Sequence, residues 1–191
     1  TATGAGAKSG ANLANAWSIT EYNTSGNWAA IDAADGKIGP NDIVYVYDDG
    51  GTFTTRILTY QSGLASKPIT ISSADGEHPK ITTAATAGMS ITKSYITVIG
   101  LDFTNCAGTN HGVEIDGATT NVILQNINST GNSANGIDIV ADGDADISNI
   151  TITGCTTYNN TSDGIHVDYG VAGGTAGTVS GISIYGTSSY R

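Results

Sequence analysis

Residues 134–155 read ANGIDIVADGDADISNITITGC, and the arrangement of apolar residues in this stretch determines the fold prediction. Two apolar pairs, Ile137/Ile139 and Ile150/Ile152, each enclose one polar residue. Alternation with a period of two indicates a strand with one face buried and the other exposed. The stretch therefore predicts two short strands that contribute to a common core.

The same two pairs recur along the chain in a fixed order, which indicates an internal repeat. Members of the first column are Ile69/Ile71, Ile96/Val98, Val122/Leu124, Ile150/Ile152 and Ile182/Ile184. Members of the second column are Met89/Ile91, Val113/Ile115, Ile137/Ile139 and Ile165/Val167. A third column, directly after Gly100, Asn126, Gly154 and Gly186, contains Leu101, Ile127, Cys155 and Thr187. Intervals of 24 to 32 residues fit one coil of short strands and turns, so the pattern predicts an all-β, single-stranded parallel β-helix, a solenoid.

We expect one domain over residues 1–191, with a cap region at residues 1–40 and stacked coils at residues 41–191. A doubly wound α/β fold is disfavoured because no helical periodicity fills the gaps after residue 60. An antiparallel sandwich stays open as an alternative, since short strands and turns do not define the pairing direction.

The cap region contains both tryptophans of the chain, Trp17 and Trp28. A solenoid exposes its core and strand edges at its ends, so these side chains are expected to plug the first coil. Residues 27–36 are predicted to form a short helix, which begins at a polar capping residue and ends at Gly36. Residues 42–47 read as the first strand.

The composition limits the partners of the protein. Seven Lys and Arg against 17 Asp and Glu give a net charge of −10, which disfavours nucleic acid and anionic membranes. No apolar run is long enough to span a membrane, and the chain begins at Thr1 with no charged and apolar leader, so we expect any signal peptide to have been removed. A charged fraction of only 13%, with many Thr, Ser and Asn residues, predicts an extracellular or cell-surface location.

Five segments resemble a known family. An Ile-Val-Tyr-Val strand after a Trp-containing cap, GTFT at residues 51–54 and SKPITI at residues 66–71 resemble the start of secreted right-handed β-helix proteins of the pectate-lyase-like superfamily. NGIDI at residues 135–139 and DGIHVD at residues 163–168 look like its repeat. The resemblance implies a right-handed coil. It leaves the activity open, because the superfamily includes polysaccharide lyases, glycoside hydrolases, phage tailspikes, adhesins and non-catalytic surface proteins.

Polar residues between the inward-facing apolar residues form the candidate site. Glu114, Asp138 and His166 are expected to point outward on consecutive coils, about 4.8 Å apart per step. Asp116 and Asp168 lie two residues further along the same face. All five are candidate catalytic residues, and the first three are candidates for carbohydrate binding. The alternative is that they form an ordinary solvated sheet face.

The resemblance implies particular residues for each enzyme class, the lyases and the glycoside hydrolases, and these can be looked for in the sequence. Lyases of the superfamily use a Lys or Arg base with calcium or another cation, yet residues 94–190 contain no Lys or Arg. NTSDGI at residues 160–165 is similar to the Asn-Thr-Asp-Gly signature of polygalacturonase-type hydrolases, with a Ser inserted. His111-Gly112 is a fragment of their Gly-His-Gly turn, and their Arg-x-Lys is missing.

The sequence also supports predictions for three further groups of residues: an acidic loop, the cysteines and two of the histidines. Asp142, Asp144 and Asp146 alternate in a loop and are candidate ligands for calcium, a cation that prefers oxygen ligands, although a solvated acidic turn is the alternative. Cys106 and Cys155 lie two coils apart, beyond disulfide reach, so both are expected to be unpaired. The histidines outside the strand columns, His78 and His111, are expected to be surface residues.

These observations favour a secreted or cell-surface module without catalysis, which acts in surface structure, adhesion or end-to-end fibre assembly. The missing base and the end of the sequence at Arg191, in the middle of a coil, led to this expectation. The partner would then be another copy of the chain or a polysaccharide. The alternative is a polysaccharide-active enzyme, a lyase or glycoside hydrolase, or its N-terminal part, which uses the outward carboxylate column.

Overall fold

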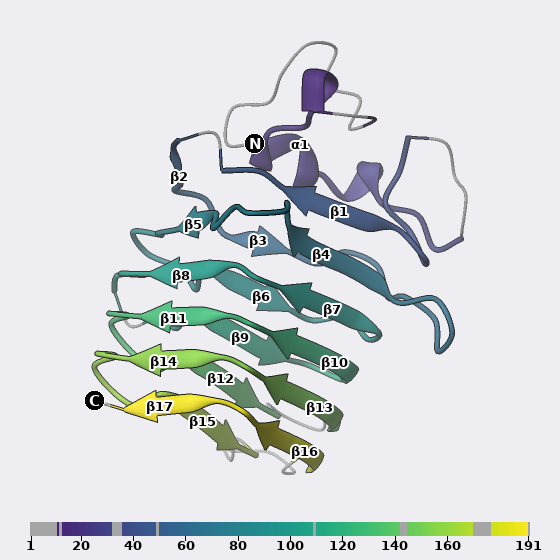
Figure 1. Cartoon of the computed structure of the whole chain (residues 1–191). Helices are drawn as coiled ribbons and strands as arrows, with labels where there is room; N and C mark the ends of the chain where they lie inside the picture. Colours follow the sequence, from purple (N-terminus) through teal and green to yellow (C-terminus); the bar gives the residue numbers. More distant parts are fainter. Residues whose placement is uncertain are drawn as a thin grey trace.

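A computed structural model of the chain describes residues 11, 13–31, 36–48, 50–108, 110–141, 145–169 and 177–190. The described strands form three sheets, which run side by side along a coiled stack (Figure 1). Each coil contributes one strand to each sheet in turn, so neighbours within a sheet are one coil apart in the sequence. The prediction of an all-β parallel β-helix is confirmed.

The strands of each sheet follow one another along the stack. Sheet 1 consists of β1 (Ile43–Val46), β4 (Ile69–Ser73), β7 (Ile96–Ile99), β10 (Thr120–Gln125), β13 (Ile147–Thr153) and β16 (Val179–Tyr185). Sheet 2 consists of β2 (Thr52–Phe53), β5 (Lys80–Ile81), β8 (Asp102–Thr104), β11 (Asn128–Thr130), β14 (Thr156–Tyr158) and β17 (Ser188–Tyr190). Sheet 3 consists of β3 (Ile57–Leu58), β6 (Met89–Ile91), β9 (Val113–Asp116), β12 (Ile137–Val140) and β15 (Ile165–Asp168).

The register of the strands is the one that the apolar columns predict. Val122 of β10 lies beside Ile96 of β7 and Ile150 of β13. All strand pairs of the three sheets are parallel in the described residues, so the antiparallel sandwich is excluded. Apolar side chains of all three sheets point into one continuous core, in which Phe103 is fully buried.

The bend between sheets 1 and 2 depends on a left-handed backbone. Gly100, Asn126, Gly154 and Gly186 have φ angles of 70°, 53°, 63° and 59°. Only Gly and Asn adopt such angles readily, which explains why these two residue types precede the third column. The sequence pattern therefore located this turn in four successive coils.

The N-terminal cap differs from the prediction. Its α-helix in the described residues is α1 (Ile19–Tyr22), which begins with a capping box formed by Ser18 and Glu21. Two short 3₁₀ turns, η1 (Leu13–Asn15) and η2 (Ser25–Asn27), flank this helix. The predicted helix at residues 27–36 is wrong where it can be judged, because Trp28 is extended and forms a parallel bridge with Ile38; residues 32–35 lie outside the described residues.

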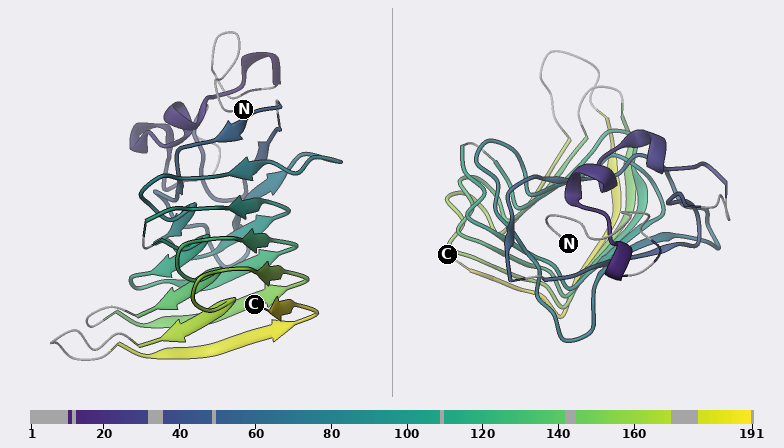
Figure 2. Two further views of the ribbon diagram at one scale, coloured as in Figure 1. Left: turned by 90° about the vertical axis from the view of Figure 1, so that its left-hand side faces the viewer. Right: turned by 90° about the horizontal axis from the view of Figure 1, so that it is seen from above.

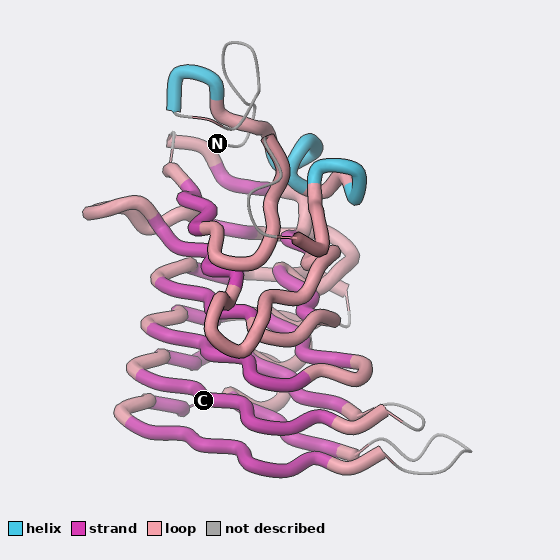
Figure 3. Tube along the Cα trace, turned by 90° about the vertical axis from the view of Figure 1, so that its right-hand side faces the viewer, coloured by secondary structure: helices cyan, strands magenta, loops and turns pink. Residues whose placement is uncertain are grey.

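Burial of Trp28 explains the difference. Its indole N–H donates to the carbonyl of Tyr22, and its ring meets the Tyr22 ring edge-on with centroids 5.2 Å apart. Trp28 is buried and Trp17 packs against the same cluster, so the predicted apolar plug is confirmed. Views from the side and from above show the cap lying over one end of the stack (Figure 2), with the described helices confined to that end (Figure 3). No described helix is long and apolar enough to cross a membrane.

Candidate functional site

Sheet 3 places the predicted site residues next to one another. Asp138 of β12 lies in register with Glu114 of β9 on one side and His166 of β15 on the other. The apolar residues that alternate with Asp138, Ile137 and Ile139, are buried in the core. The prediction that the three polar residues share the outer face of consecutive coils is confirmed.

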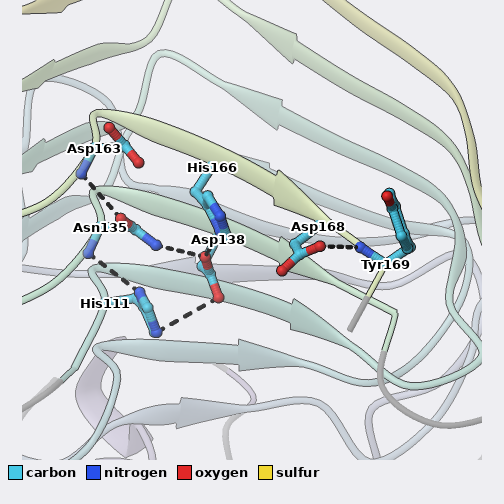
Figure 4. Close-up of polar contacts among 7 residues, drawn as sticks. All are labelled: His111, Asn135, Asp138, Asp163, His166, Asp168 and Tyr169. Atoms are coloured by element: carbon cyan, nitrogen blue, oxygen red, sulfur yellow. Dashed lines mark hydrogen bonds and ion pairs between the residues drawn. The ribbon is translucent and has the colours of Figure 1, made fainter. Parts of the chain in front are cut away.

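Asp138 is the centre of a hydrogen-bonded cluster. Its Oδ1 accepts from the side-chain amide of Asn135 at 2.6 Å and from Nδ1 of His166 at 2.8 Å. Its Oδ2 lies 3.5 Å from Nε2 of His111 (Figure 4). The side chains that surround it leave Asp138 only 4% exposed, although its strand position faces outward. Such a buried carboxylate needs these donors, because burial without partners would be costly.

The hydrogen bonds assign different proton positions to the two histidines. His111 Nδ1 accepts from the backbone N–H of Asn135 at 3.2 Å, so the proton of a neutral ring is on Nε2, which faces Asp138. His166 presents Nδ1 to Asp138, so its proton is on Nδ1 and its Nε2 carries the lone pair. The His166 side chain is 36% exposed and that of His111 19% exposed. His166 therefore offers a basic nitrogen that solvent or a ligand can reach.

Asn135 joins this cluster to the next coil. Its Oδ1 accepts from the backbone N–H of Asp163 at 3.0 Å while its amide holds Asp138. Asn135, His111 and Asp163 are equivalent positions, since each directly precedes the Gly that leads into a sheet 3 strand. The turns that contain these three residues therefore lie where the strands of sheet 3 begin.

Sequence reasoning missed two members of the cluster, His111 and Asn135. The prediction that His111 is a surface residue without a partner is wrong, because its ring is mostly buried against Asp138 and Asn135. The stacking of successive coils brings them together, since His111 lies one coil before Asn135 and Asp138 and contacts both. The recurring position before each Gly was a signal that could have aligned the turns, as the apolar pairs aligned the strands.

Glu114 is half-buried beside the cluster. Burial raises its pKa above the usual value, His111 lowers it in part, and the carboxylates of Asp116 and Asp138 raise it. Arg56 contributes a weaker lowering. Desolvation disfavours the charged carboxylate, so Glu114 keeps its proton to a higher pH than an exposed glutamate does. The outer face of sheet 3 thus carries an imidazole with a free ring nitrogen and a carboxyl group whose pKa is raised.

Asp116 and Asp168 do not join the cluster. Val140 of β12 lies between them in the sheet, in register with both. The carboxylate of Asp116 accepts from the backbone N–H of Gly117, and that of Asp168 accepts from the backbone N–H of Tyr169. Figure 4 shows Asp168 further along β15, apart from Asp138. The structure therefore places these two predicted residues on the same sheet but outside the hydrogen-bonded cluster around Asp138.

The predicted calcium loop is described only at Asp146. Its Oδ1 accepts from the backbone N–H of Thr178 at 2.8 Å and from the hydroxyl at 2.7 Å, and these hydrogen bonds lower its pKa. Asp142 and Asp144 lie outside the described residues. Within the described part of the chain, no three His, Cys, Asp or Glu side chains are grouped so that they could hold a metal ion. Calcium binding by this loop stays a prediction.

The remaining candidates behave as predicted. Cys106 and Cys155 are both unpaired and buried, and burial raises the pKa of the Cys155 thiol. His78 is exposed. The hydrogen bonds of the two cysteines go to residues outside the cluster around Asp138 in the described structure.

Fold and site together define a class: a parallel β-helix that carries a carboxylate-oriented imidazole on the outer face of one sheet. Residues 14–187 match the family described as Pel9A-like, right handed beta helix region, and the chain belongs to this family. No curated protein sequence is similar to the chain.

Comparison with solved structures gives two matches, of which the first has a similar fold. The alginate lyase from Paenibacillus sp. str. FPU-7 superposes with a TM-score of 0.55 at 17% identity, over 78% of this chain and 59% of that chain. A rhamnogalacturonan lyase superposes with a TM-score of 0.44 at 18% identity, over 82% of this chain and 44% of that chain. The chain thus spans less than two thirds of the length of either protein.

Proposed function

We propose that this chain is all or part of a polysaccharide-active enzyme, and that it cleaves a uronate-containing polysaccharide by β-elimination. The observation that carries the proposal is the hydrogen bond between His166 Nδ1 and the buried carboxylate of Asp138. A carboxylate that orients an imidazole and stabilises its protonated form is a common general-base arrangement. The sequence favoured a non-catalytic module because a base was missing, and His166 now fills that role.

The reaction needs a base and an acid at one glycosidic bond. His166 Nε2 takes the proton from the carbon next to the uronate carboxylate, and Asp138 stabilises the resulting imidazolium. The electrons of that C–H bond form a C=C bond while the glycosidic C–O bond breaks. Protonated Glu114, whose pKa burial raises, donates its proton to the leaving oxygen. Solvent then restores the proton of Glu114 and removes the one on His166.

Hydrolysis by a carboxylate pair is less compatible with this geometry. A retaining hydrolase uses one carboxylate as a nucleophile, which must approach the sugar. The Asp138 carboxylate is only 4% exposed and is enclosed by Asn135 and the two histidines. An attack on a sugar carbon would require this network to break. Its position suits the orientation of His166 instead.

Fold comparison supports the polysaccharide partner in a general way. The chain belongs to the Pel9A-like β-helix family, and one protein of similar fold is an alginate lyase. A charge of −10 with few charged residues is compatible with the extracellular or cell-surface location that we propose. Such a location would give the protein access to wall and matrix polysaccharides.

The test is a cleavage assay on the purified chain with alginate, polygalacturonate and rhamnogalacturonan. β-Elimination generates an unsaturated uronate that absorbs ultraviolet light, whereas hydrolysis generates reducing ends without this absorbance. We expect the absorbance to rise with at least one polymer, to be lost in His166→Ala, and to be kept in His78→Ala, which removes an exposed histidine outside the site. Reducing ends without absorbance would favour a hydrolase, and no cleavage of any polymer would favour the non-catalytic module.

A further inference from the structure

A groove of about 390 Å³ lies on the outer face of sheet 1, a different sheet from the one that carries the cluster around Asp138. Its floor is a column of residues in register on β7, β10, β13 and β16. These residues are Thr97, Ile123, Thr151 and Ser183. The column runs along the stack, so the groove crosses successive coils.

The wall of the groove is a column of residues with a left-handed backbone. Tyr95, Asn121, Asn149 and Gly181 have φ angles of 57°, 57°, 57° and 64°. Asn and Gly tolerate this conformation, but a bulky residue such as Tyr adopts it only at a cost. Hydrogen bonds to both neighbouring coils hold Tyr95 in place: its N–H donates to Thr120 and its carbonyl accepts from Ile69. A tyrosine thus occupies a position where the backbone conformation alone would favour Asn or Gly.

A hairpin closes one end of the groove. Leu64 and Lys67 form an isolated antiparallel bridge, and Ala65 and Pro68 of this hairpin line the groove. The hairpin extends out from the stack between β3 and β4, as Figure 1 shows. Floor and wall therefore come from the same strands, two residues apart, and the hairpin borders them at one end.

The groove is uncharged in a strongly acidic protein. None of its lining residues is an Asp, Glu, Lys, Arg or His, although the chain carries a net charge of −10. Hydroxyl and amide residues line it together with an exposed isoleucine, Ile123, and the half-buried Tyr95. An anionic polymer would find no cation here. Neutral sugars present hydroxyls for hydrogen bonds and C–H faces that pack on an aromatic ring, so they match both kinds of group.

The repeat of the groove favours a polymer over a small ligand. Equivalent positions recur at each coil, about 4.8 Å apart, a step close to the length of one pyranose unit. The side chains at these positions differ from coil to coil, but those of the floor are uncharged at every step, so a polysaccharide chain that lies along the stack would meet an uncharged surface at each sugar.

We propose that the groove on sheet 1 binds a neutral polysaccharide chain along the axis of the solenoid, independently of the site on sheet 3. This binding site goes beyond the proposed lyase activity, since the neutral chain is held and not cleaved. It would keep the enzyme on a wall or matrix in which neutral and acidic polysaccharides occur together.

Affinity electrophoresis tests the proposal with gels that contain a xylan, a mixed-linkage glucan or a galactomannan, and with polygalacturonate for comparison. We expect at least one neutral polymer to retard the wild-type chain. Tyr95→Asn removes the ring but suits the left-handed backbone, and Ile123→Lys places a charge on the floor. Each is expected to weaken binding about tenfold or more, which corresponds to about 1.4 kcal/mol or more.

Two controls separate this site from the rest of the molecule. Gln125→Lys adds the same charge at an exposed position of β10 outside the groove, and His166→Ala disables the proposed base. Both are expected to bind the neutral polymer as the wild type does. No retardation by any of the neutral polymers, or equal retardation of Tyr95→Asn and the wild type, would overturn the proposal. Loss of cleavage in His166→Ala with unchanged retardation would show that the two sites are independent.

Discussion

Replacement of Asp138 by Asn is the most direct test of the cluster on sheet 3. The change keeps the size of the side chain but replaces one acceptor oxygen with a donor. All three neighbours of Asp138 present donors to it: the Asn135 amide at 2.6 Å, His166 Nδ1 at 2.8 Å and His111 Nε2 at 3.5 Å. An asparagine therefore cannot satisfy all three in either orientation.

The two orientations have different consequences. If the new amide faces His111, two donors oppose each other, and His111 cannot move its proton to Nδ1 without losing the bond from the Asn135 backbone. If the new amide faces His166, that ring must accept on Nδ1 and hold its proton on Nε2, which blocks it as a base. Either orientation also removes the negative charge that stabilises the imidazolium.

We expect Asp138→Asn to lower kcat about 10²- to 10⁴-fold, the usual contribution of general acid–base catalysis. The free energy of unfolding should fall by about 1–3 kcal/mol, because one buried donor loses its acceptor. Initial rates of unsaturated uronate formation and urea unfolding measure the two effects. Asp168→Asn, on the same face with its carboxylate bound to its own backbone neighbour, is the matched control and should leave the rate unchanged. An Asp138→Asn variant that folds and retains the wild-type rate would refute the assignment of His166 as an oriented base.

Three further predictions follow from the fold and the site. Because burial raises the pKa of Glu114 in the folded protein, the native state binds more protons than the unfolded state between the ordinary and the raised pKa, so the free energy of unfolding should fall as pH rises through that window. Glu114→Gln should remove this slope in urea unfolding at a series of pH values and should also lower the cleavage rate; an unchanged slope would contradict the burial effect. Gly136→Ala should destabilise the fold by about 1–3 kcal/mol, because a Cβ there would lie 2.5 Å from the Gly164 carbonyl oxygen and 2.7 Å from Asn160 Nδ2. Gly26→Ala, with open space around the new Cβ, should unfold as the wild type does. Phe103→Ala should cost about 3–5 kcal/mol in the same assay because the ring is fully buried, and a loss below 1 kcal/mol would indicate that the stack collapses around it.

The coils could be predicted from the sequence because each strand and turn is determined by residues that are close together in the chain. An inward apolar pair such as Val122/Leu124 marks a strand by itself, and equal spacing aligns each strand with its neighbours one coil away. The left-handed turn at Asn126 is likewise determined by residue type. Glu114, Asp138 and His166 could be placed on one face for the same reason, since strand register and side-chain alternation together define the outer column.

The period-two pattern does not specify the turns or the N-terminal cap, and tertiary contacts determine their structure. The turns before the strands of sheet 3 vary in length and have no period-two pattern, so only the structure shows His111 and Asn135 against Asp138. Their contacts convert an apparently solvated carboxylate into a buried one and assign the proton of His166. In the cap, the residues after Trp28 have helix-forming composition, yet Trp28 is extended because its ring is buried against Tyr22 and its backbone pairs with Ile38. Local pattern thus determines a repeating solenoid, whereas the position of each proton and the path of each irregular segment depend on neighbours that are distant in the sequence.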